Sequence, residues 1–547
     1  MTFFDHHLLS VILFTPLAGA LVLLFVNRRQ EDAIRWIANA FGIAGFAVSI
    51  PLWFRFQPFG DPWQFVERAE WIPSIGATYF LGVDGLSALL VLLTTLVGAI
   101  AILSSWTAIT ERVKEYYIIL LVLQTGLIGA FVALDTLLFF LFWEVMMVPM
   151  YFLIGMWGGG RRLYSAIKFF LYTLAGSVVM LLGILALYFV NHAATGVYSF
   201  DITQFQQLSV PFDVQKWIFL ALFLGFAVKV PIFPFHTWLP DAHTDAPTAG
   251  SVMLAAIMLK MGTYGFIRFS LPILPDATRY FVPLVAGLSI VGVIYGALVA
   301  LAQSDWKRLV AYSSVSHMGL AMLGMFALTP VGITGSIVQQ INHAISTGAL
   351  FLIVGIVYER RQSNEISEFG GLSKVMPVLA TVFLVMTMSS IGLPALNGFI
   401  GEILILQGLY VVHKTWAAIA ASGIVLGAAY MLWLYQRTMF GKIDNPANAA
   451  MKDLNAREIA TFVPLVALAV WIGLYPEPVL RRLQSSVGRV VVRVNSVYGP
   501  AIAKAEADCN RPAAPVVIPG APAGLMLTPP CETPAGIPAP KPAQGRR

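Results

Sequence analysis

The chain has 547 residues, of which 58% are hydrophobic and only 11% are charged. In a soluble globular domain about a quarter of the residues are charged, so this composition excludes a soluble globular protein and indicates one that crosses a lipid bilayer several times. The formal net charge of +6 does not require a nucleic-acid partner, because basic residues in a membrane protein usually set its orientation.

The cysteines limit the cofactor chemistry of this chain. Cys509 and Cys531 are the only two, and both lie outside the apolar part of the sequence. An iron–sulfur cluster or a structural zinc site needs about four Cys or His ligands, and no Gly-rich dinucleotide motif follows a strand. We therefore expect no metal and no redox cofactor here, so that any electron chemistry occurs on another polypeptide.

The apolar segments predict an all-α polytopic membrane protein. The first apolar run, residues 8–26, is long enough to cross a bilayer. Asp5, His6 and His7 precede it where a signal peptide would carry positive charge, so we interpret it as the first span. Further apolar segments centre near residues 45, 92, 125, 145, 178, 222, 258, 290, 318, 345, 390, 428 and 470. The sequence thus predicts about fourteen transmembrane helices.

Basic residues predict how these spans are oriented. They gather in loops that follow odd-numbered spans: Arg28, Arg29, Arg35, Arg112, Lys114, Arg161, Arg162, Lys307, Arg308, Arg360, Arg361, Lys442 and Lys452. The positive-inside rule makes this side cytoplasmic. With fourteen spans, both termini then lie on the periplasmic side of a bacterial inner membrane. A possible amphipathic segment at 481–493 carries four arginines against this pattern.

Two spans are interrupted by proline. The seventh carries Lys229 and breaks at Pro231 and Pro234, after which the chain turns through a polar loop and enters the span that carries Lys260. Each proline lacks an N–H and clashes with the carbonyl four residues earlier, so we expect the carbonyls at 227 and 230 to lose their helical partners. The twelfth span breaks at Pro394 and is followed by Glu402.

Broken helices in the two halves of one chain are typical of inverted repeats that face each other across a functional site. We expect one five-helix repeat in spans four to eight and another in spans nine to thirteen, which makes Lys229 and Glu402 rough counterparts. The expected divisions are residues 1–115 (spans one to three), 116–272, 279–440, 460–480 (span fourteen) and a Pro-rich tail at 481–547, which we expect to be disordered.

Ionisable residues at membrane depth are the candidate functional residues. Glu144 lies in the fifth span, and Lys229 is the cation that we expect to pair with it. A structural ion pair is the alternative, but a buried salt bridge is weak evidence for stability, whereas ionisable residues within spans recur in proton relays. Lys260 has no acidic neighbour in sequence, which favours a relay over a salt bridge.

Two histidines extend this set. His317 and His343 lie in the tenth and eleventh spans, and Ser336, Gln340, His343 and Thr347 recur at steps of four, three and four, which makes one polar helix stripe. A lone buried histidine is usually a structural residue, but a polar stripe favours a hydrated path. We interpret Glu402 as the last protonatable group of this path, with compensation of a half-helix start as the alternative.

Other polar residues are weaker candidates. Lys168 lies about one turn inside the sixth span, where its ammonium could reach the interface. His236 and Asp241 flank the first break and are more simply explained as loop structure. Asp84 and Asp135 lie near span ends.

Four motifs together resemble those of a known family: LGVDGLS at 81–87, HTWLPDAHTDAPTAGSVMLAAIMLKMGTYG at 236–265, AYSSVSHMG at 311–319 and LPALNGFIGE at 393–402. The sequence over roughly residues 1–480 resembles the antiporter-like membrane subunits of respiratory complex I. Glu402 favours one branch of these antiporter-like subunits, because the sister subunits and the chains of multisubunit sodium/proton antiporters usually have lysine at this position. Where the family often has an apolar residue and Glu, this chain has Thr244 and Asp245, which retains the acid.

The resemblance implies a proton-translocating role in NADH:quinone oxidoreductase. It implies that Glu144 and Lys229 interact, that Lys260 is the central relay, that His317 and His343 connect it, and that Glu402 is the distal site. It also implies that NADH, FMN, iron–sulfur clusters and quinone bind to other subunits, and that the partners are membrane-arm subunits including two sister antiporter-like chains. A cation/proton antiporter subunit and a structural membrane spacer with inert charges are the alternatives.

Overall fold

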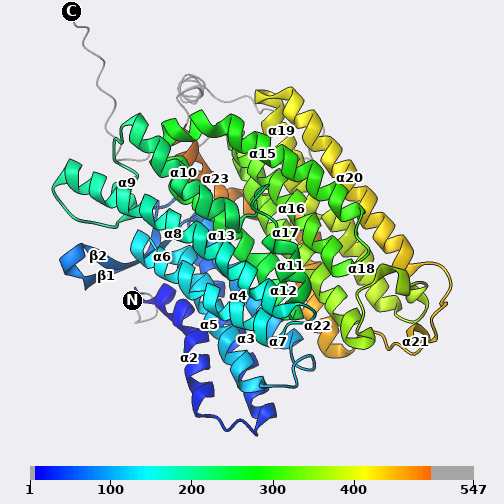
Figure 1. Cartoon of the computed structure of the whole chain (residues 1–547). Helices are drawn as coiled ribbons and strands as arrows, with labels where there is room; N and C mark the ends of the chain where they lie inside the picture. The colour runs from blue at the N-terminus through cyan, green and yellow to red at the C-terminus, as the bar shows by residue number, and fades with distance from the viewer. Residues whose placement is uncertain (1–5, 495–547) are drawn as a thin grey trace, which may run out of the picture. The chain divides into compact units, whose positions relative to one another are not determined.

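Residues 6–494 are described in the computed structural model of the chain. The predictions for Asp5, Cys509, Cys531 and residues 495–547 of the tail lie outside the described residues. Within 6–494 almost every element is a helix, as expected (Figure 1).

The first half of the described chain contains, in order, α2 (Leu8–Phe25), α3 (Glu31–Arg55), β1 (Gln64–Ile72), the 3₁₀ turn η1 (Pro73–Ile75), β2 (Ala77–Val83), α4 (Gly85–Ser104), α5 (Val113–Val132), α6 (Thr136–Val145), α7 (Met147–Trp157), α8 (Arg162–Thr195), α9 (Ile202–Phe205), α10 (Phe212–Lys229), α11 (Trp238–Asp245), α12 (Thr248–Met253), the π-helix η2 (Leu254–Met258), α13 (Leu259–Gly265), the π-helix η3 (Phe266–Ser270) and α14 (Leu271–Ile273).

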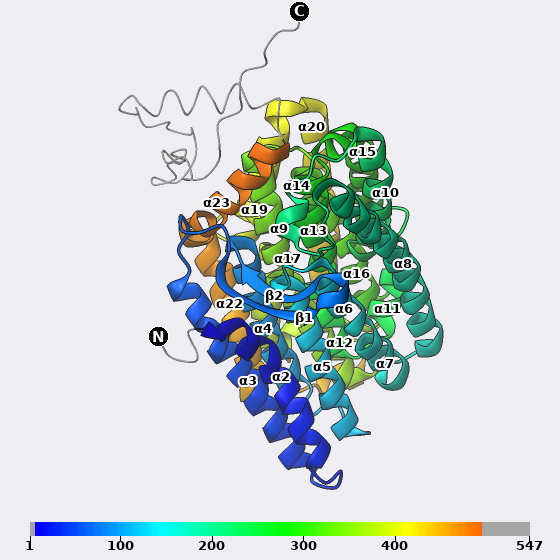
Figure 2. The same cartoon turned by 90° about the vertical axis from the view of Figure 1, so that its left-hand side faces the viewer.

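The second half contains α15 (Pro275–Leu301), α16 (Trp306–Met325), α17 (Pro330–Arg361), the 3₁₀ turns η4 (Ile366–Glu368) and η5 (Leu372–Lys374), α18 (Pro377–Ser390), α19 (Asn397–Val412), α20 (Lys414–Met439), α21 (Pro446–Ala449), α22 (Ala456–Leu474) and α23 (Glu477–Val494). Figure 2 shows α8, α10 and α15 along one side of this unit.

Eleven helical segments in the described part are long and apolar enough to cross a membrane. Each of the fourteen expected segment centres lies in a helix, and the three spans that do not meet these criteria correspond to α10, α16 and the pair α18/α19. α10 carries Asp213, Lys216 and Lys229, and α18 and α19 are shorter than a full span. The count of fourteen spans stays a prediction.

The core is built around two helical segments. In Thr248–Ile273 every residue of the most apolar window is buried, and in Pro330–Arg361 94% of that window is buried, whereas most other spans keep a lipid-facing side. These two segments pack against each other and are surrounded by α4, α16 and α19. The first segment carries Lys260 and the second carries His343, so these two predicted residues are enclosed by protein.

Aspartates begin several of the spans. The Asp84 carboxylate accepts a hydrogen bond from Ser87 N at 3.0 Å at the start of α4, and Asp135 accepts from Leu137 N and Leu138 N at 2.9 and 3.0 Å at the start of α6. Such caps satisfy orphan backbone donors. Asp135, a weak site candidate, is therefore a structural cap.

A two-stranded antiparallel hairpin is the exception to the all-helical prediction. β1 and β2 pair antiparallel, with Glu67 opposite Leu81, in the segment between α3 and α4. The Glu67 carboxylate accepts from Leu9 N at 2.7 Å and Ser10 N at 3.1 Å, so it caps α2 from 57 residues away. The hairpin thereby fixes the N-terminal end of α2.

α23 corrects the expected division of the C-terminal part. Residues 481–494, which were grouped with the Pro-rich tail, form most of an amphipathic helix that lies against α4, α14, α15 and α17. Arg482 donates to Trp53 O at 2.7 Å and Arg493 to Pro272 O at 3.3 Å. Arginines of α23 thus donate to carbonyls at the ends of other elements, which explains why they occur outside the loops that the positive-inside pattern predicted.

We expect Glu67→Gln to loosen the hairpin. The substitution removes a charged acceptor of two buried N–H groups, which costs about 1–3 kcal/mol. Hydrogen exchange of residues 64–83 in the purified protein should become faster, and exposed Glu70→Gln on the same strand is the matched control. Equal exchange in both variants would show that the cap contributes nothing.

Candidate functional site

The first helix break is compact and partly satisfied from within. Pro231 follows the end of α10, and the Ala227 carbonyl, expected to be free, accepts from Ile232 N at 2.8 Å. The Val228 carbonyl accepts from Trp238 Nε1 at 2.8 Å. The break therefore holds Lys229 at the end of a half-helix in the interior.

Glu144 and Lys229 lie in each other's electrostatic field, from the end of α6 and the end of α10. Lys229 is only 1% exposed. Its Nζ lies 5.3 Å from the centre of the Trp143 ring and 5.6 Å from that of the Phe169 ring. This nitrogen has no hydrogen-bond partner within residues 6–494. Glu144 lies beside Ser177 of α8, and its Oε1 also has no partner in that range. The two groups thus interact electrostatically without forming a closed salt bridge.

Lys260 and His343 form the central contact. Lys260 Nζ lies 2.6 Å from His343 Nδ1 and donates to Ala255 O at 2.5 Å, and both side chains are buried. Lys260 follows Ala255 by five residues, the spacing of a π turn, so its side chain folds back onto that carbonyl. Two nitrogens at this distance cannot both point a hydrogen at each other, so one of them donates the hydrogen bond and the other accepts it.

The predicted polar stripe of α17 faces the helix of Lys260. Thr263 Oγ1 donates to Gln340 Oε1 at 2.5 Å, and Gln340 Nε2 donates to Ser336 Oγ at 3.3 Å. Thr347 Oγ1 and His343 Nε2 are buried and have no partner in the described chain. Polar groups therefore continue along α17 on both sides of the central pair.

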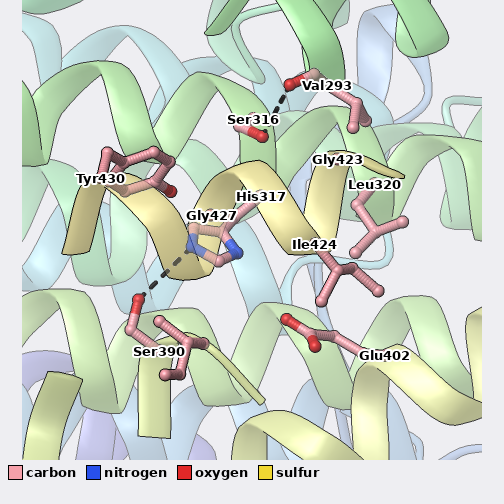
Figure 3. A pocket seen from close by; sticks show the side chains of 11 residues that line it. Val293, Ser316, His317, Leu320, Ser390, Glu402, Gly423, Ile424, Gly427 and Tyr430 are labelled. Carbon is pink, nitrogen blue, oxygen red and sulfur yellow. Dashed lines mark hydrogen bonds between the residues drawn. The ribbon is translucent and has the colours of Figure 1, made fainter. Parts of the chain in front are cut away.

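His317 connects this centre to a pocket. Its ring centre lies 5.8 Å from that of His343, and its Nε2 lies 3.4 Å from Ser390 Oγ. His317, Ser390, Glu402 and Tyr430 all line a small pocket between α15, α16, the end of α18, α19 and α20 (Figure 3). The structure thus brings Lys260, His343, His317 and Glu402 into one sequence of neighbours.

The second helix break lies directly against the Glu402 carboxylate. Gly392, in the interrupted span beside Pro394, has φ +73°, and a Cβ added to it would lie 2.0 Å from Glu402 Oε2. Only glycine adopts this conformation at little cost and permits so close an approach. Glu402 is the sixth residue of α19, beyond its first turn, so it does not cap the half-helix. Asn342 Nδ2 of α17 donates to Asn397 O at 2.6 Å and ties the break to the central helix.

His243 was missed by sequence reasoning. It lies in α11, is fully buried and stacks on Phe351 at 4.7 Å, and neither ring nitrogen has a partner among the described residues. It lies in the electrostatic field of both Lys307 and Lys260. Lys307, used above only as an orientation signal, is buried and donates to Ala246 O at 2.5 Å. The sequence signal that could have found His243 is its position between Lys229 and Lys260, in the segment that joins the two lysine-bearing spans.

The secondary candidates form separate groups. Lys168 pairs with Asp241 at 2.7 Å, and Arg308 and Arg161 also approach Asp241 at 3.5 and 3.9 Å. His236 lies among aromatic rings, 5.3 Å from that of Tyr295. These contacts fasten the first break and do not join the central chain of neighbours.

Comparison with known proteins agrees with this geometry. The family described as "NADH:quinone oxidoreductase/Mrp antiporter, TM" matches residues 133–427. The chain is 46% identical over 507 residues to NADH-quinone oxidoreductase subunit M of Rhodobacter capsulatus, covering 90% of this chain and 98% of the relative. It superposes on a chain of respiratory complex I from Thermus thermophilus with a TM-score of 0.82 and 29% identity, over 89% and 100% of the two chains. The fold also matches a chain of the Mrp complex from Dietzia sp., with a TM-score of 0.76 and 22% identity over 89% and 52%.

The chain belongs to the NADH:quinone oxidoreductase/Mrp antiporter family of membrane subunits. Within that family it falls with the subunit M, or chain 4, type of respiratory complex I. The family resemblance of the four motifs is confirmed.

Proposed function

We propose that this chain moves protons across a bacterial inner membrane, driven by NADH oxidation and quinone reduction in other subunits of the complex. The observation that carries this proposal is the buried contact of Lys260 with His343 at 2.6 Å, because one proton shared by two groups of the interior can pass to either side. NADH, FMN, iron–sulfur clusters and quinone then belong to partner subunits, and two sister antiporter-like chains are neighbours in the membrane arm. Both termini lie on the periplasmic side.

Each residue has a defined role in this proposal. Lys229 and Glu144 hold the switchable charge pair, Lys260 and His343 share the central proton, and His317 passes it to Glu402. His243 supplies Lys260 from the side of Lys307. Buried polar groups without a protein partner bind water in membrane interiors, so water completes the relay at His243, Thr347 and Lys229.

The energetics are consistent with a charge pair as part of the drive. Opposite charges about 7 Å apart attract by about 2.4 kcal/mol at an effective dielectric constant of about 20. Moving a proton against about 150 mV takes about 3.5 kcal/mol. Opening the pair of Glu144 and Lys229 therefore supplies a large part of the work, and neighbouring subunits supply the rest.

We expect Glu144→Gln to lower NADH-driven proton pumping by about 50-fold, because about 2.4 kcal/mol of lost bias corresponds to a factor of about 50 to 60 in rate. Pumping and quinone reduction are measured on the purified complex in proteoliposomes, with assembly checked on a native gel. Glu115→Gln, on a partly exposed carboxylate paired with Arg28 at 3.0 Å, is the control. Normal coupled turnover in Glu144→Gln would contradict the role of the pair, and pumping that requires Na⁺ would favour cation/proton antiport.

His243→Gln should slow proton uptake. The amide keeps polarity but cannot exchange a proton, so the pumping rate should fall about tenfold or more, in line with the loss of an acid–base group. A larger solvent deuterium isotope effect on turnover would identify proton uptake as the slow step. His413→Gln, beside Trp416 at the end of α19, should leave both quantities unchanged, and an unaffected His243→Gln enzyme would remove His243 from the relay.

Gly392→Ala should displace Glu402. Gly392 and Gly441 both have positive φ, so alanine strains both by about 1 kcal/mol, but a Cβ at Gly441 meets nothing within 4 Å. We expect pumping to fall in Gly392→Ala and to persist in Gly441→Ala, at equal complex content. Equal pumping by the two variants would show that the position of Glu402 is not required.

A further inference from the structure

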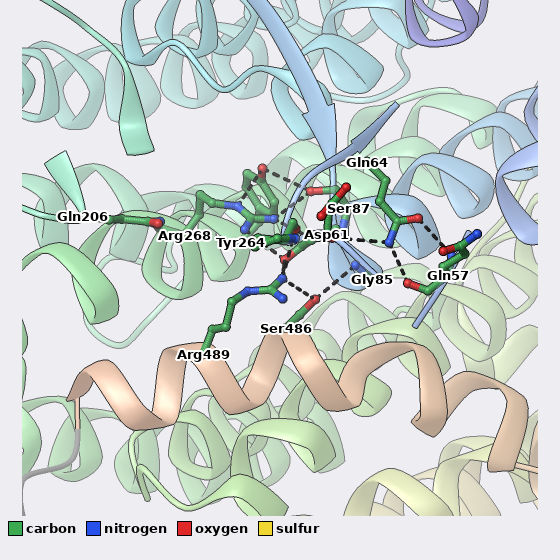
Figure 4. Close-up of polar contacts among 12 residues, drawn as sticks. Gln57, Asp61, Gln64, Gly85, Ser87, Gln206, Tyr264, Arg268, Ser486 and Arg489 are labelled. Atoms are coloured by element: carbon green, nitrogen blue, oxygen red, sulfur yellow. Dashed lines mark hydrogen bonds and ion pairs between the residues drawn. The ribbon is translucent and has the colours of Figure 1, made fainter. Parts of the chain in front are cut away.

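A buried charged cluster closes the end of the span that carries Lys260. Arg268, in η3, faces Asp84 at the start of α4, and Arg489 reaches the same carboxylate from α23 (Figure 4). Arg268 lies eight residues after Lys260, which places it roughly 12 Å further along the span. The cluster therefore lies between Lys260 and that end of the helical unit where the β1/β2 hairpin lies.

Arg268 is fully engaged. Its Nη1 and Nη2 donate to the two Asp84 oxygens at 3.0 and 2.6 Å, Nη2 also donates to Ser87 Oγ at 2.8 Å, and Nε donates to Tyr264 OH at 3.2 Å. The Trp63 ring lies 4.5 Å from its guanidinium carbon. This two-pronged geometry is the strongest form of an arginine–carboxylate contact, so the guanidinium is fixed in place.

Arg489 adds a second positive charge. Its guanidinium lies 3.9 Å from Asp84 Oδ2 and donates to Pro62 O at 3.1 Å. α23 itself touches the start of α4: Ser486 Oγ accepts from Gly85 N at 3.1 Å. Burial alone would raise the pKa of Asp84, but Arg268 and Arg489 outweigh it and hold that pKa well below its usual range.

The charge balance decides what this cluster can do. Asp84 stays ionised and its oxygens are occupied, so it does not carry protons. Two arginines against one carboxylate leave a net charge of +1. Arg268 and Asp84 are buried, whereas the Arg489 side chain is 36% exposed at the edge of the cluster, so this charge is only partly screened by solvent. A fixed arginine in a narrow passage repels protons. Between Lys260 and this charge, Thr263 and Tyr264 continue the polar side of the same span.

We infer that Asp84, Arg268 and Arg489 form an electrostatic barrier that prevents protons from returning to Lys260 along its own span, and that α23 completes the barrier by supplying Arg489. This inference rests on the proposed relay through Lys260. A purely structural staple between α4, η3 and α23 is the competing role, and it predicts altered stability without altered proton permeability.

The test measures passive proton leak. Purified complex is reconstituted in proteoliposomes without NADH or quinone, a potassium diffusion potential is imposed with valinomycin, and internal pH is followed with a trapped dye. Arg489→Gln should raise the leak attributable to the complex about tenfold, as expected for removing one nearby charge. Arg489→Lys, which keeps the charge, should leak like the parent.

Two further variants make the result specific. Arg482→Gln removes another arginine of the same helix, whose guanidinium donates to Trp53 O and not to Asp84, and should not leak. The double variant Arg489→Gln/Lys260→Ala should return to the parental leak, because the returning proton needs Lys260. A parental leak in Arg489→Gln, an equal leak in Arg482→Gln, or a persistent leak in the double variant would each overturn the barrier. Normal pumping by Lys260→Ala alone would instead contradict the relay.

Discussion

The hydrogen bond between Lys260 and His343 is the contact on which the polar interior depends. The two side chains come from the two most enclosed helical segments of the described chain, and a lysine in that environment is costly unless a polar partner meets it. A π turn on each side of α13 shapes the helix that presents Lys260. The packing of these two segments is thus set by chemistry as much as by apolar area.

The rest of the polar interior is arranged around that contact with few closed ion pairs. Lys229 lies between aromatic rings, His243 stacks on Phe351, and Glu402 lies against a glycine backbone. Closed salt bridges lie apart from this contact, as in Lys168 with Asp241 and Arg268 with Asp84. Groups held loosely change protonation at low cost, whereas groups in closed pairs fix geometry. In the proposed function, this distribution separates the relay residues from the residues that hold the helices together.

Much of this arrangement could be predicted from sequence, because length and apolarity define a membrane helix almost alone. The helix centres, both breaks and the polar stripe of α17 followed from such local patterns. The strand pairing of the hairpin did not, since its stabilising carboxylate, Glu67, bonds to a residue 57 positions away. His243 and the partners of Arg489 were also missed, because their roles depend on contacts between distant segments that no local period reveals. The arginines of α23 resembled a topology signal until their carbonyl partners were known.

The capping of α2 by Glu67 has a consequence for biosynthesis. The first turn of that helix obtains its carboxylate only after α3 has been made and the hairpin residues have reached the same side of the membrane. A nascent chain that stops before residue 67 therefore carries a first span whose N-terminal N–H groups lack this acceptor. The contact between the hairpin and α2 therefore forms late, and the N-terminal pair of helices becomes fixed only when the second crossing is complete.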